Sequence, residues 1–216
     1  MAEEAVLMRS KINPEEFISV FDPRVGRKET YLLFEIQWNF KGRFYRGCCR
    51  NSNDSHAEVN FIENIFKTKI QNNSKKCWMT WYMSWSPCGI CAKAITSFLA
   101  EYTNVTLEIR MARLFRHTDY RNKAGLKALH GSPAYIYIMA EQDYRYCWRT
   151  FVNYQQRDFM LWPYTTFMML YFIHHLLVIL EELSILGWVL PPYLPLTSAT
   201  PSDHHQLLDK KFWRKQ

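Results

Sequence analysis

The chain has 216 residues, of which 48% are hydrophobic, 22% are charged and 16% are aromatic. This balance is ordinary for a folded soluble protein, and the length allows one domain with an appendage and a substantial core. The formal net charge of +7 favours polyanionic partners. The most apolar run, residues 167–180, is interrupted by His174 and His175 and closed by two glutamates, so it is too short and too polar for a membrane span.

The N-terminal part of the chain predicts a β-hairpin followed by a helix. Residues 31–38 are rich in aromatic and aliphatic side chains and predict a strand. The polar residues 39–42 are expected to turn the chain back into a second strand over residues 44–50. Residues 53–55 (Asn, Asp, Ser) offer capping side chains ahead of a helix over residues 56–70.

Strands and helices alternate in the next part of the chain. Strands are predicted over residues 77–86, 105–112 and 134–139, and helices over residues 89–102, 119–130 and 141–154. The strand at 105–112 has the alternation of apolar and polar residues that is typical of a half-buried strand. A hairpin followed by strand–helix–strand–helix–strand predicts an α/β protein with a five-stranded mixed sheet, about six flanking helices and parallel last two strands.

The composition changes after Trp162 and Pro163. Residues 167–190 predict a strongly apolar helix, which Pro191 and Pro192 break. The end of the chain is basic, with three lysines and an arginine in residues 210–215. We therefore expect a folded domain over residues 1–163 and a second element over residues 164–216, made of the apolar helix and the basic tail.

Four residues carry a recognisable chemistry: His56, Glu58, Cys88 and Cys91. One imidazole and two thiolates are zinc ligands, and three protein ligands leave a fourth position for water, as in catalytic zinc sites. The order H-x-E followed by P-C-x-x-C is the signature of zinc-dependent nucleobase deaminases. The sequence therefore predicts one zinc ion per chain, held by His56, Cys88 and Cys91.

Two other interpretations of the cysteine pair are a redox dithiol and half of a four-cysteine zinc ribbon. The ribbon lacks its second pair, because no further C-x-x-C is formed by the remaining cysteines: Cys48, Cys49, Cys77 and Cys147. A redox dithiol stays possible but leaves His56, Glu58 and Pro87 without a role.

Glu58 is the expected proton carrier. Zinc lowers the pKa of its water, and the hypothesis is that Glu58 takes the proton, delivers it to N3 of cytosine as hydroxide attacks C4, and then helps to protonate the departing ammonia. Residues two apart on a regular helix point to nearly opposite sides. His56 is therefore expected at the non-helical start of its helix. Helix starts are also expected to stabilise the thiolates of Cys88 and Cys91.

Further motifs resemble the family of APOBEC and activation-induced polynucleotide cytidine deaminases, over about residues 12–192. They are the runs at residues 27–31, 50–51, 84–88, 112–115 and 146–154. Within the family, the chain is most similar to the branch that edits apolipoprotein B messenger RNA, through residues 21–24, residues 59–63 and the apolar helix that ends at Pro191 and Pro192. The tail beyond Pro192 matches this branch poorly.

The resemblance implies a cytidine-deaminase-like three-layer fold and hydrolytic conversion of cytidine to uridine in single-stranded DNA or RNA. It implies that Trp85 and Phe115 line the base pocket, that Asn51 hydrogen-bonds the target nucleotide and that Thr30 closes the pocket. Phe115 stands where the family usually has a tyrosine, so a hydroxyl contact is missing. The loop at residues 115–119 is expected to set the preference for the base 5′ to the cytosine.

Basic residues interleaved with aromatic ones predict the path of the nucleic acid. The expected substrate contacts are Arg27, Arg50 and Arg116. Two basic stretches surround them: Lys41, Arg43, Arg46 and Arg50 in the hairpin, and Arg110, Arg113, Arg116, His117, Arg121 and Lys123 around the later loop. A solvated charged face is the alternative interpretation of both stretches.

The leading hypothesis is thus a hydrolase, a zinc-dependent cytidine deaminase that acts on single-stranded nucleic acid. The alternatives are a deaminase of free cytidine and a catalytically silent, zinc-containing RNA-binding module. Possible partners are a second copy, through the C-terminal apolar helix, and an RNA-binding protein that directs the enzyme to its target. No membrane association is expected. The first residues lack the apolar core of a secretory signal and the thiolates must stay reduced, so we expect the cytoplasm and the nucleus.

Overall fold

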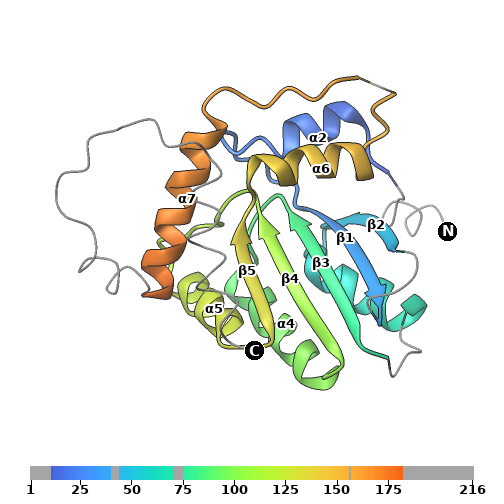
Figure 1. The fold of residues 1–216 in the computed structure, drawn as a ribbon. Coiled ribbons are helices and arrows are strands. Elements are labelled where there is room, and N and C mark those ends of the chain that lie inside the picture. The colour runs from blue at the N-terminus through green and yellow to red at the C-terminus, as the bar shows by residue number, and fades with distance from the viewer. Residues whose placement is uncertain (1–10, 40–43, 71–74, 156, 182–216) are drawn as a thin grey trace. The chain divides into compact units, whose positions relative to one another are not determined.

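Five strands form one mixed sheet in the order β2-β1-β3-β4-β5. The structure is a computed structural model that describes residues 11–39, 44–70, 75–155 and 157–181. The strands are β1 (Tyr31–Trp38), β2 (Tyr45–Arg50), β3 (Cys77–Met83), β4 (Val105–Met111) and β5 (Ala134–Ile138). Strand β1 is antiparallel to both β2 and β3, whereas β3, β4 and β5 run parallel (Figure 1). The predicted α/β class, the mixed sheet and the parallel last strands are confirmed.

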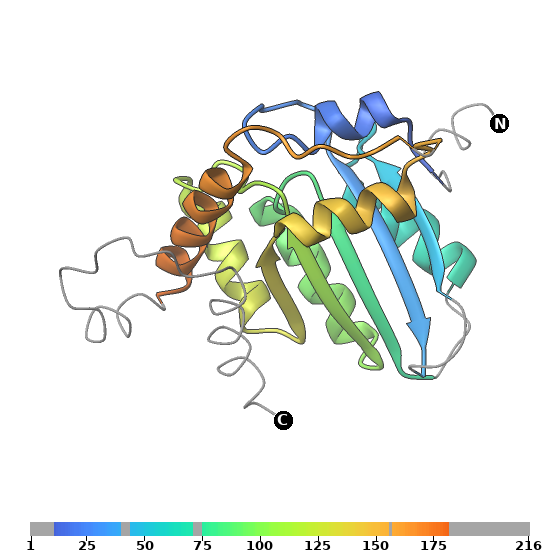
Figure 2. The ribbon, with the colours of Figure 1, turned by 45° about the horizontal axis from the view of Figure 1, so that its top comes forward.

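Helices cover both faces of the sheet. They are α2 (Pro14–Val20), α3 (Ala57–Asn60), η1 (Phe61–Ile70), α4 (Gly89–Glu101), α5 (Tyr120–His130), α6 (Glu141–Phe151) and α7 (Thr165–Leu180). Helices α2 and α6 lie on one face, and α4 and α5 lie behind the strands in the view of Figure 1. Figure 2 shows α6 crossing the sheet near the ends of the strands. The result is a three-layer arrangement.

Each face of the sheet has its own hydrophobic core. On one face, Leu33 and Tyr82 pack with Phe17 of α2 and with Tyr144 and Trp148 of α6. The larger core on the other face joins the remaining strand residues to η1, α4, α5 and α7. The two cores follow from the alternation of side chains along each strand, since successive residues of β1 such as Leu32 and Leu33 are buried on opposite faces.

The helices differ from the sequence prediction in three places. Helix α2 was not predicted; it begins after Asn13, whose backbone N–H donates to Glu16 Oε2 over 3.2 Å. The helix expected over residues 56–70 is α-helical only in α3 and continues as a π-helix in η1. Helix α6 ends at Phe151 because Val152 has extended backbone and pairs with Ile12. The part of the predicted apolar helix beyond residue 181 lies outside the described residues.

Phe61 is expected to contribute strongly to stability because it joins η1 to the centre of the sheet. Its ring centroid lies 4.8 Å from that of Phe34 and 4.9 Å from that of Trp81, and all three side chains are fully buried. Phe61→Ala is expected to lower the free energy of unfolding by about 3–5 kcal/mol. Chemical denaturation measures this, with exposed Ile18→Ala as the control, for which the expected change is within about 0.5 kcal/mol. Equal denaturation midpoints for the two variants would contradict the packing.

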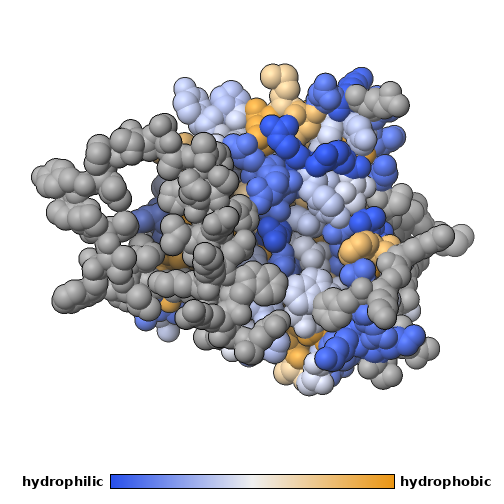
Figure 3. Space-filling view, viewed as in Figure 1, coloured by the Kyte–Doolittle hydropathy of each residue, from blue (hydrophilic) through white to orange (hydrophobic). Residues whose placement is uncertain are grey.

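Within the described residues, no helix is long and apolar enough to cross a membrane. Figure 3 shows the face that carries α2 and α6 in space-filling form, where hydrophilic residues predominate and the hydrophobic patches are small among the residues that are coloured. The exposed apolar side chains of α7 include Phe167 and Leu170, which are 66% and 56% exposed.

Candidate metal centre and active site

His56 and Cys88 both stand at the start of a helix. His56 is the N-cap of α3 and Cys88 is the N-cap of α4, and both have extended backbone, with ψ values of 157° and 170°. The predicted non-helical position of His56 is therefore confirmed. The capping side chains were expected among residues 53–55, whereas the N-cap is His56, one residue later. Helices α3 and α4 contact each other, which brings these two helix starts together.

The side chains of His56, Cys88 and Cys91 converge. His56 Nδ1 lies 3.2 Å from Cys91 Sγ and 3.5 Å from Cys88 Sγ, and the three donor atoms all lie within 4.8 Å of one another. Tetrahedral zinc with Zn–S of about 2.3 Å and Zn–N of about 2.0 Å places a nitrogen and a sulfur about 3.5 Å apart. The donor set and its spacing therefore fit a metal ion. No other such group of three occurs in the described part of the chain.

The two thiols have unequal proton affinities. A hydrogen bond from Cys91, together with the backbone N–H groups of Cys91 and Ile90, lowers the pKa of Cys88 to about 5. The pKa of Cys91 is raised because its thiol donates to Cys88 and is buried. Cys88 is therefore a thiolate at neutral pH in the chain alone. A bound cation favours loss of the second proton as well.

Glu58 lies in the first turn of α3 and is only 3% exposed. Burial raises the pKa of its carboxyl to about 7. A carboxyl with this pKa can both accept and return a proton near neutral pH. The same carboxyl interacts with Cys91 and His56, so it belongs to the same site as the three metal-ligand candidates.

Trp85, three residues before Cys88, is in contact with Phe115. Their ring centroids are 6.0 Å apart and their planes are at 83°, an edge-to-face pair. Trp85 Nε1 donates to the carbonyl oxygen of Arg27 over 2.8 Å, which ties the segment before β1 to the ring. The two aromatic residues that the resemblance places in the base pocket are thus neighbours.

Thr30 and Asn51 are also neighbours. The Thr30 N–H donates to Asn51 Oδ1 over 2.7 Å, and the Asn51 N–H donates to the Thr30 carbonyl over 3.1 Å. Of the three predicted arginine contacts, Arg27 and Arg116 are exposed and Arg50 is partly buried. The Arg116 guanidinium carbon lies 5.3 Å from the centroid of the Phe115 ring.

Arg113 does not face the nucleic acid path, and the prediction that placed it there is wrong. Its side chain is 1% exposed and lies under Trp85, with the guanidinium carbon 4.3 Å from that ring. It donates to the carbonyls of Ser84, Asp22, Val20 and Val25. Arg113 therefore holds residues 20–25 close to the Trp85 ring through these hydrogen bonds.

Arg110 was also placed wrongly. It lies on the α6 face of the sheet, where it pairs with Glu108 and, over 3.0 Å, with Asp143. Arg46 in β2 pairs with Glu35, which accepts a further hydrogen bond from Tyr146 over 2.6 Å. Because side chains alternate along a β-strand, Arg46 and Arg110 point to the α6 face of the sheet, away from the metal centre. Their contacts help to pack α6 on the sheet.

Sequence reasoning missed Asn122, a buried residue in the first turn of α5. Its Oδ1 accepts from the Gly89 N–H over 2.9 Å, and its Nδ2 donates to the carbonyls of Phe115 and Arg116 over 3.2 and 3.3 Å. Asn122 thus links the start of α4, next to Cys88, to the loop after β4. The close approach requires glycine at position 89, where a Cβ would lie 2.6 Å from the Arg121 carbonyl oxygen.

Residues 20–154 match the family model described as APOBEC4-like AID/APOBEC deaminase. The C->U-editing enzyme APOBEC-1 of Mus musculus is 47% identical over 156 residues, which are 72% of this chain and 68% of that protein. APOBEC-1 of Homo sapiens is 40% identical over 192 residues, 88% of this chain and 78% of that protein. The DNA dC->dU-editing enzyme APOBEC-3H of Felis catus is 32% identical over 137 residues, 63% of this chain and 70% of that protein. The chain belongs to the AID/APOBEC family of deaminases.

Proposed function

We propose that the chain converts cytidine to uridine in single-stranded DNA or RNA, with one zinc ion held by His56, Cys88 and Cys91. The observation that carries the proposal is the convergence of these three donors with the buried carboxyl of Glu58. The relatives named as C->U-editing and DNA dC->dU-editing enzymes support cytidine as the target. The donor set supports zinc, because imidazole and thiolate together are ligands that zinc prefers.

A bound zinc ion supplies Lewis acidity, which makes a water molecule acidic enough to act as a nucleophile near neutral pH. Glu58 takes a proton from the attacking water and delivers it to N3 of the cytosine as the oxygen adds to C4. Glu58 then takes the second proton from the new hydroxyl on C4 and passes it to the exocyclic nitrogen, so that the C4–N bond breaks, C4=O forms and ammonia leaves. The sum is cytosine plus water giving uracil plus ammonia.

The target base is held by residues around this centre. Trp85 and Phe115 offer an edge-to-face aromatic pair on which an unstacked base can lie. Asn51 uses its Oδ1 on the Thr30 N–H, so its Nδ2 is the group that we expect to donate to the target nucleotide. Arg27, Arg50 and Arg116 contact the phosphates. We also propose that the loop at residues 115–119 sets the preference for the base 5′ to the cytosine.

The remaining proposals concern partners, compartments and domain limits. The exposed Phe167 and Leu170 of α7 support a homodimer through this helix, which a concentration-dependent sedimentation coefficient would reveal. The cytoplasm and nucleus, a targeting RNA-binding protein, and a division of the chain at residues 163 and 164 stay predictions.

The substrate class is tested by incubating the chain with matched DNA and RNA oligonucleotides that contain a single cytosine, and with free cytidine. We expect conversion in at least one type of strand and none of free cytidine. The basic residues near the loop after β4 support this preference for a strand. Conversion of free cytidine at an equal or higher rate would contradict the proposal, and strand binding without conversion would favour the silent RNA-binding module.

A further inference from the structure

The buried amide of Asn122 joins two parts of the candidate active site. The residue lies in the first turn of α5 and is 6% exposed. Its Oδ1 accepts from the Gly89 N–H, which directly follows Cys88 in the chain. Its Nδ2 donates to the carbonyls of Phe115 and Arg116. Rotating the amide by a half turn would set nitrogen against an N–H and oxygen against two carbonyls, so only one orientation satisfies all three contacts.

The contact with Gly89 fixes the first turn of α4. The first N–H groups of a helix have no partner within that helix. The N–H groups of Ile90 and Cys91 act on the Cys88 thiolate. The Gly89 N–H is instead taken by Asn122, which belongs to another helix. The direction in which the start of α4 presents Cys88 therefore depends in part on the position of α5.

Helices α4 and α5 approach closely at this point. A Cβ on Gly125 of α5 would lie 2.8 Å from the Ala92 Cβ and 3.0 Å from the Gly89 Cα, both in α4. Glycine at position 125 permits this approach because it has no side chain. Asn122 lies three residues before Gly125 on α5, so its distance from the start of α4 is fixed by the packing of the two helices.

The contacts with the loop after β4 hold a strained backbone. Arg116 has a φ of 39°, in the left-handed region, which residues with a side chain adopt only where the surroundings hold them there. The Arg116 carbonyl accepts from Asn122 Nδ2 and, over 2.9 Å, from the Asp119 N–H. The Phe115 N–H donates to Ser86 Oγ over 2.9 Å. Hydrogen bonds therefore fix the backbone that carries the Phe115 ring.

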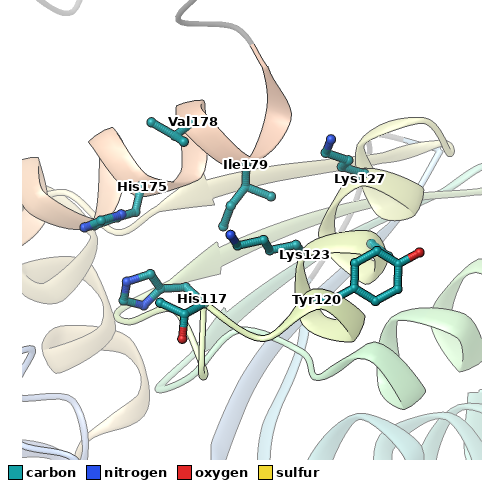
Figure 4. Close-up of a pocket in the computed structure, with 9 residues that line it drawn as sticks. His117, Tyr120, Lys123, Lys127, His175, Val178 and Ile179 are labelled. Atoms are coloured by element: carbon teal, nitrogen blue, oxygen red, sulfur yellow. The ribbon is translucent and has the colours of Figure 1, made fainter.

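Packing on the other side of the loop does not replace these hydrogen bonds. A cavity of about 620 Å³ lies between α5 and α7, and His117 and Thr118 of the loop line it. Figure 4 shows His117 at the edge of this cavity, with His175 above it on α7. The two rings lie 4.4 Å apart, but this contact holds side chains and not the backbone of Phe115. A cavity offers the residues that line it no atoms to pack against.

We infer that Asn122 is a positioning residue of the deaminase site. It keeps the Phe115 ring of the base pocket and Cys88 at the start of α4 in one arrangement, so that a base held by the pocket lies correctly at the metal centre. A misplacement of about 1 Å at a reacting centre can cost about a hundredfold in rate. The inference rests on the proposed function, since the arrangement matters for a base that is deaminated at this centre.

Two substitutions separate the two contacts. Asn122→Asp keeps the shape and an oxygen for the Gly89 N–H, but its carboxylate cannot donate to the loop carbonyls. Asn122→Ala removes both contacts and buries no charge, so the test does not depend on the stability of Asn122→Asp. Asn39→Asp is the matched control, because Asn39 is exposed and follows β1 at the end of that strand opposite to Thr30. The measurements are kcat and KM on a single-stranded oligonucleotide and zinc affinity by competition with a chelator, on samples shown to be folded by circular dichroism.

Asn122→Asp is expected to raise KM about tenfold, the effect of losing the hydrogen bonds that hold the loop, with little change in kcat. Its zinc affinity should stay within about twofold of the wild type, because the acceptor for the Gly89 N–H remains. Asn122→Ala is expected to raise KM to a similar extent and to weaken zinc affinity about tenfold, at the lower end of the effect of outer-shell partners of metal ligands.

A merely structural role would lower the melting temperatures of both variants and leave KM and zinc affinity at the values of Asn39→Asp. That result, in a wild type that deaminates strands, overturns the inference while the proposed function stands. If the wild type binds zinc but deaminates no strand, the proposed function fails and the inference fails with it.

Discussion

Glu58→Gln is expected to reduce turnover of a single-stranded substrate by a factor of about 10²–10⁴, the usual contribution of a positioned general acid–base group. Glutamine has nearly the same shape but cannot accept the proton of the attacking water. Zinc content should not change, because Glu58 is not one of the three converging donors. Single-turnover deamination and metal analysis of the same protein sample measure both quantities.

The fold of this variant should stay intact. Burial raises the pKa of Glu58 because the ionised carboxyl is disfavoured inside the protein, so a neutral amide at this position removes an unfavourable charge. The melting temperature of Glu58→Gln is expected to equal or exceed that of the wild type. Glu63→Gln is the matched control, since Glu63 lies in η1 with a half-exposed side chain paired to Lys67. Wild-type turnover in Glu58→Gln would refute its assignment as the proton carrier.

Arg113→Met is expected to lower the free energy of unfolding by about 3–5 kcal/mol and to raise KM for the strand. The substitution removes the donor to four carbonyls; three of these hydrogen bonds are buried, and of those three carbonyls the one of Asp22 keeps a second donor, the Val25 N–H. An unsatisfied buried group costs about 1–3 kcal/mol when it cannot reach water. It also removes the cation beneath Trp85 and releases residues 20–25 from the aromatic pocket. Denaturation midpoints and steady-state kinetics measure the two effects.

Arg113→Lys separates charge from geometry. Lysine keeps the positive charge but has no planar fork of five donors, so it can satisfy only part of the carbonyl set. The free energy of unfolding of Arg113→Lys should lie between those of the wild type and Arg113→Met. Arg149→Met, an exposed residue of α6, should change the free energy of unfolding by no more than about 0.5 kcal/mol. Equal free energies of unfolding for Arg113→Met and Arg149→Met would contradict the role of Arg113 in holding residues 20–25.

Local patterns explain why much of the fold could be predicted. The alternation of residues 105–112 follows directly from a strand with one face in the larger core and the other face only partly buried, and β4 has that burial pattern. Helix α2 escaped prediction because it has seven residues and no repeated apolar period of its own. Its signal is the short run from Asn13 to Glu16, in which proline occupies the first turn and the glutamate reaches back to the Asn13 N–H.

The metal-ligand candidates could be found because their spacing is local, whereas the residues that support the pocket depend on long-range packing. Arg113 follows a strand as one more basic residue, and only the folded chain places it under Trp85 among carbonyls that are remote in sequence. Asn122 is likewise an ordinary polar residue of a helix until the loop and α4 close around it. Sequence alone does not indicate that a charged or polar side chain turns inward.

The most direct test of the central claim is to remove metal from the chain and to add zinc back while strand deamination is followed. The ligand set of His56, Cys88 and Cys91 predicts that the metal-free chain is inactive and that activity rises linearly and stops at one zinc per chain. Cys88→Ala should neither retain zinc nor recover activity at the same zinc concentration. Full deamination by a metal-free chain, or undiminished activity in Cys88→Ala, would contradict the account.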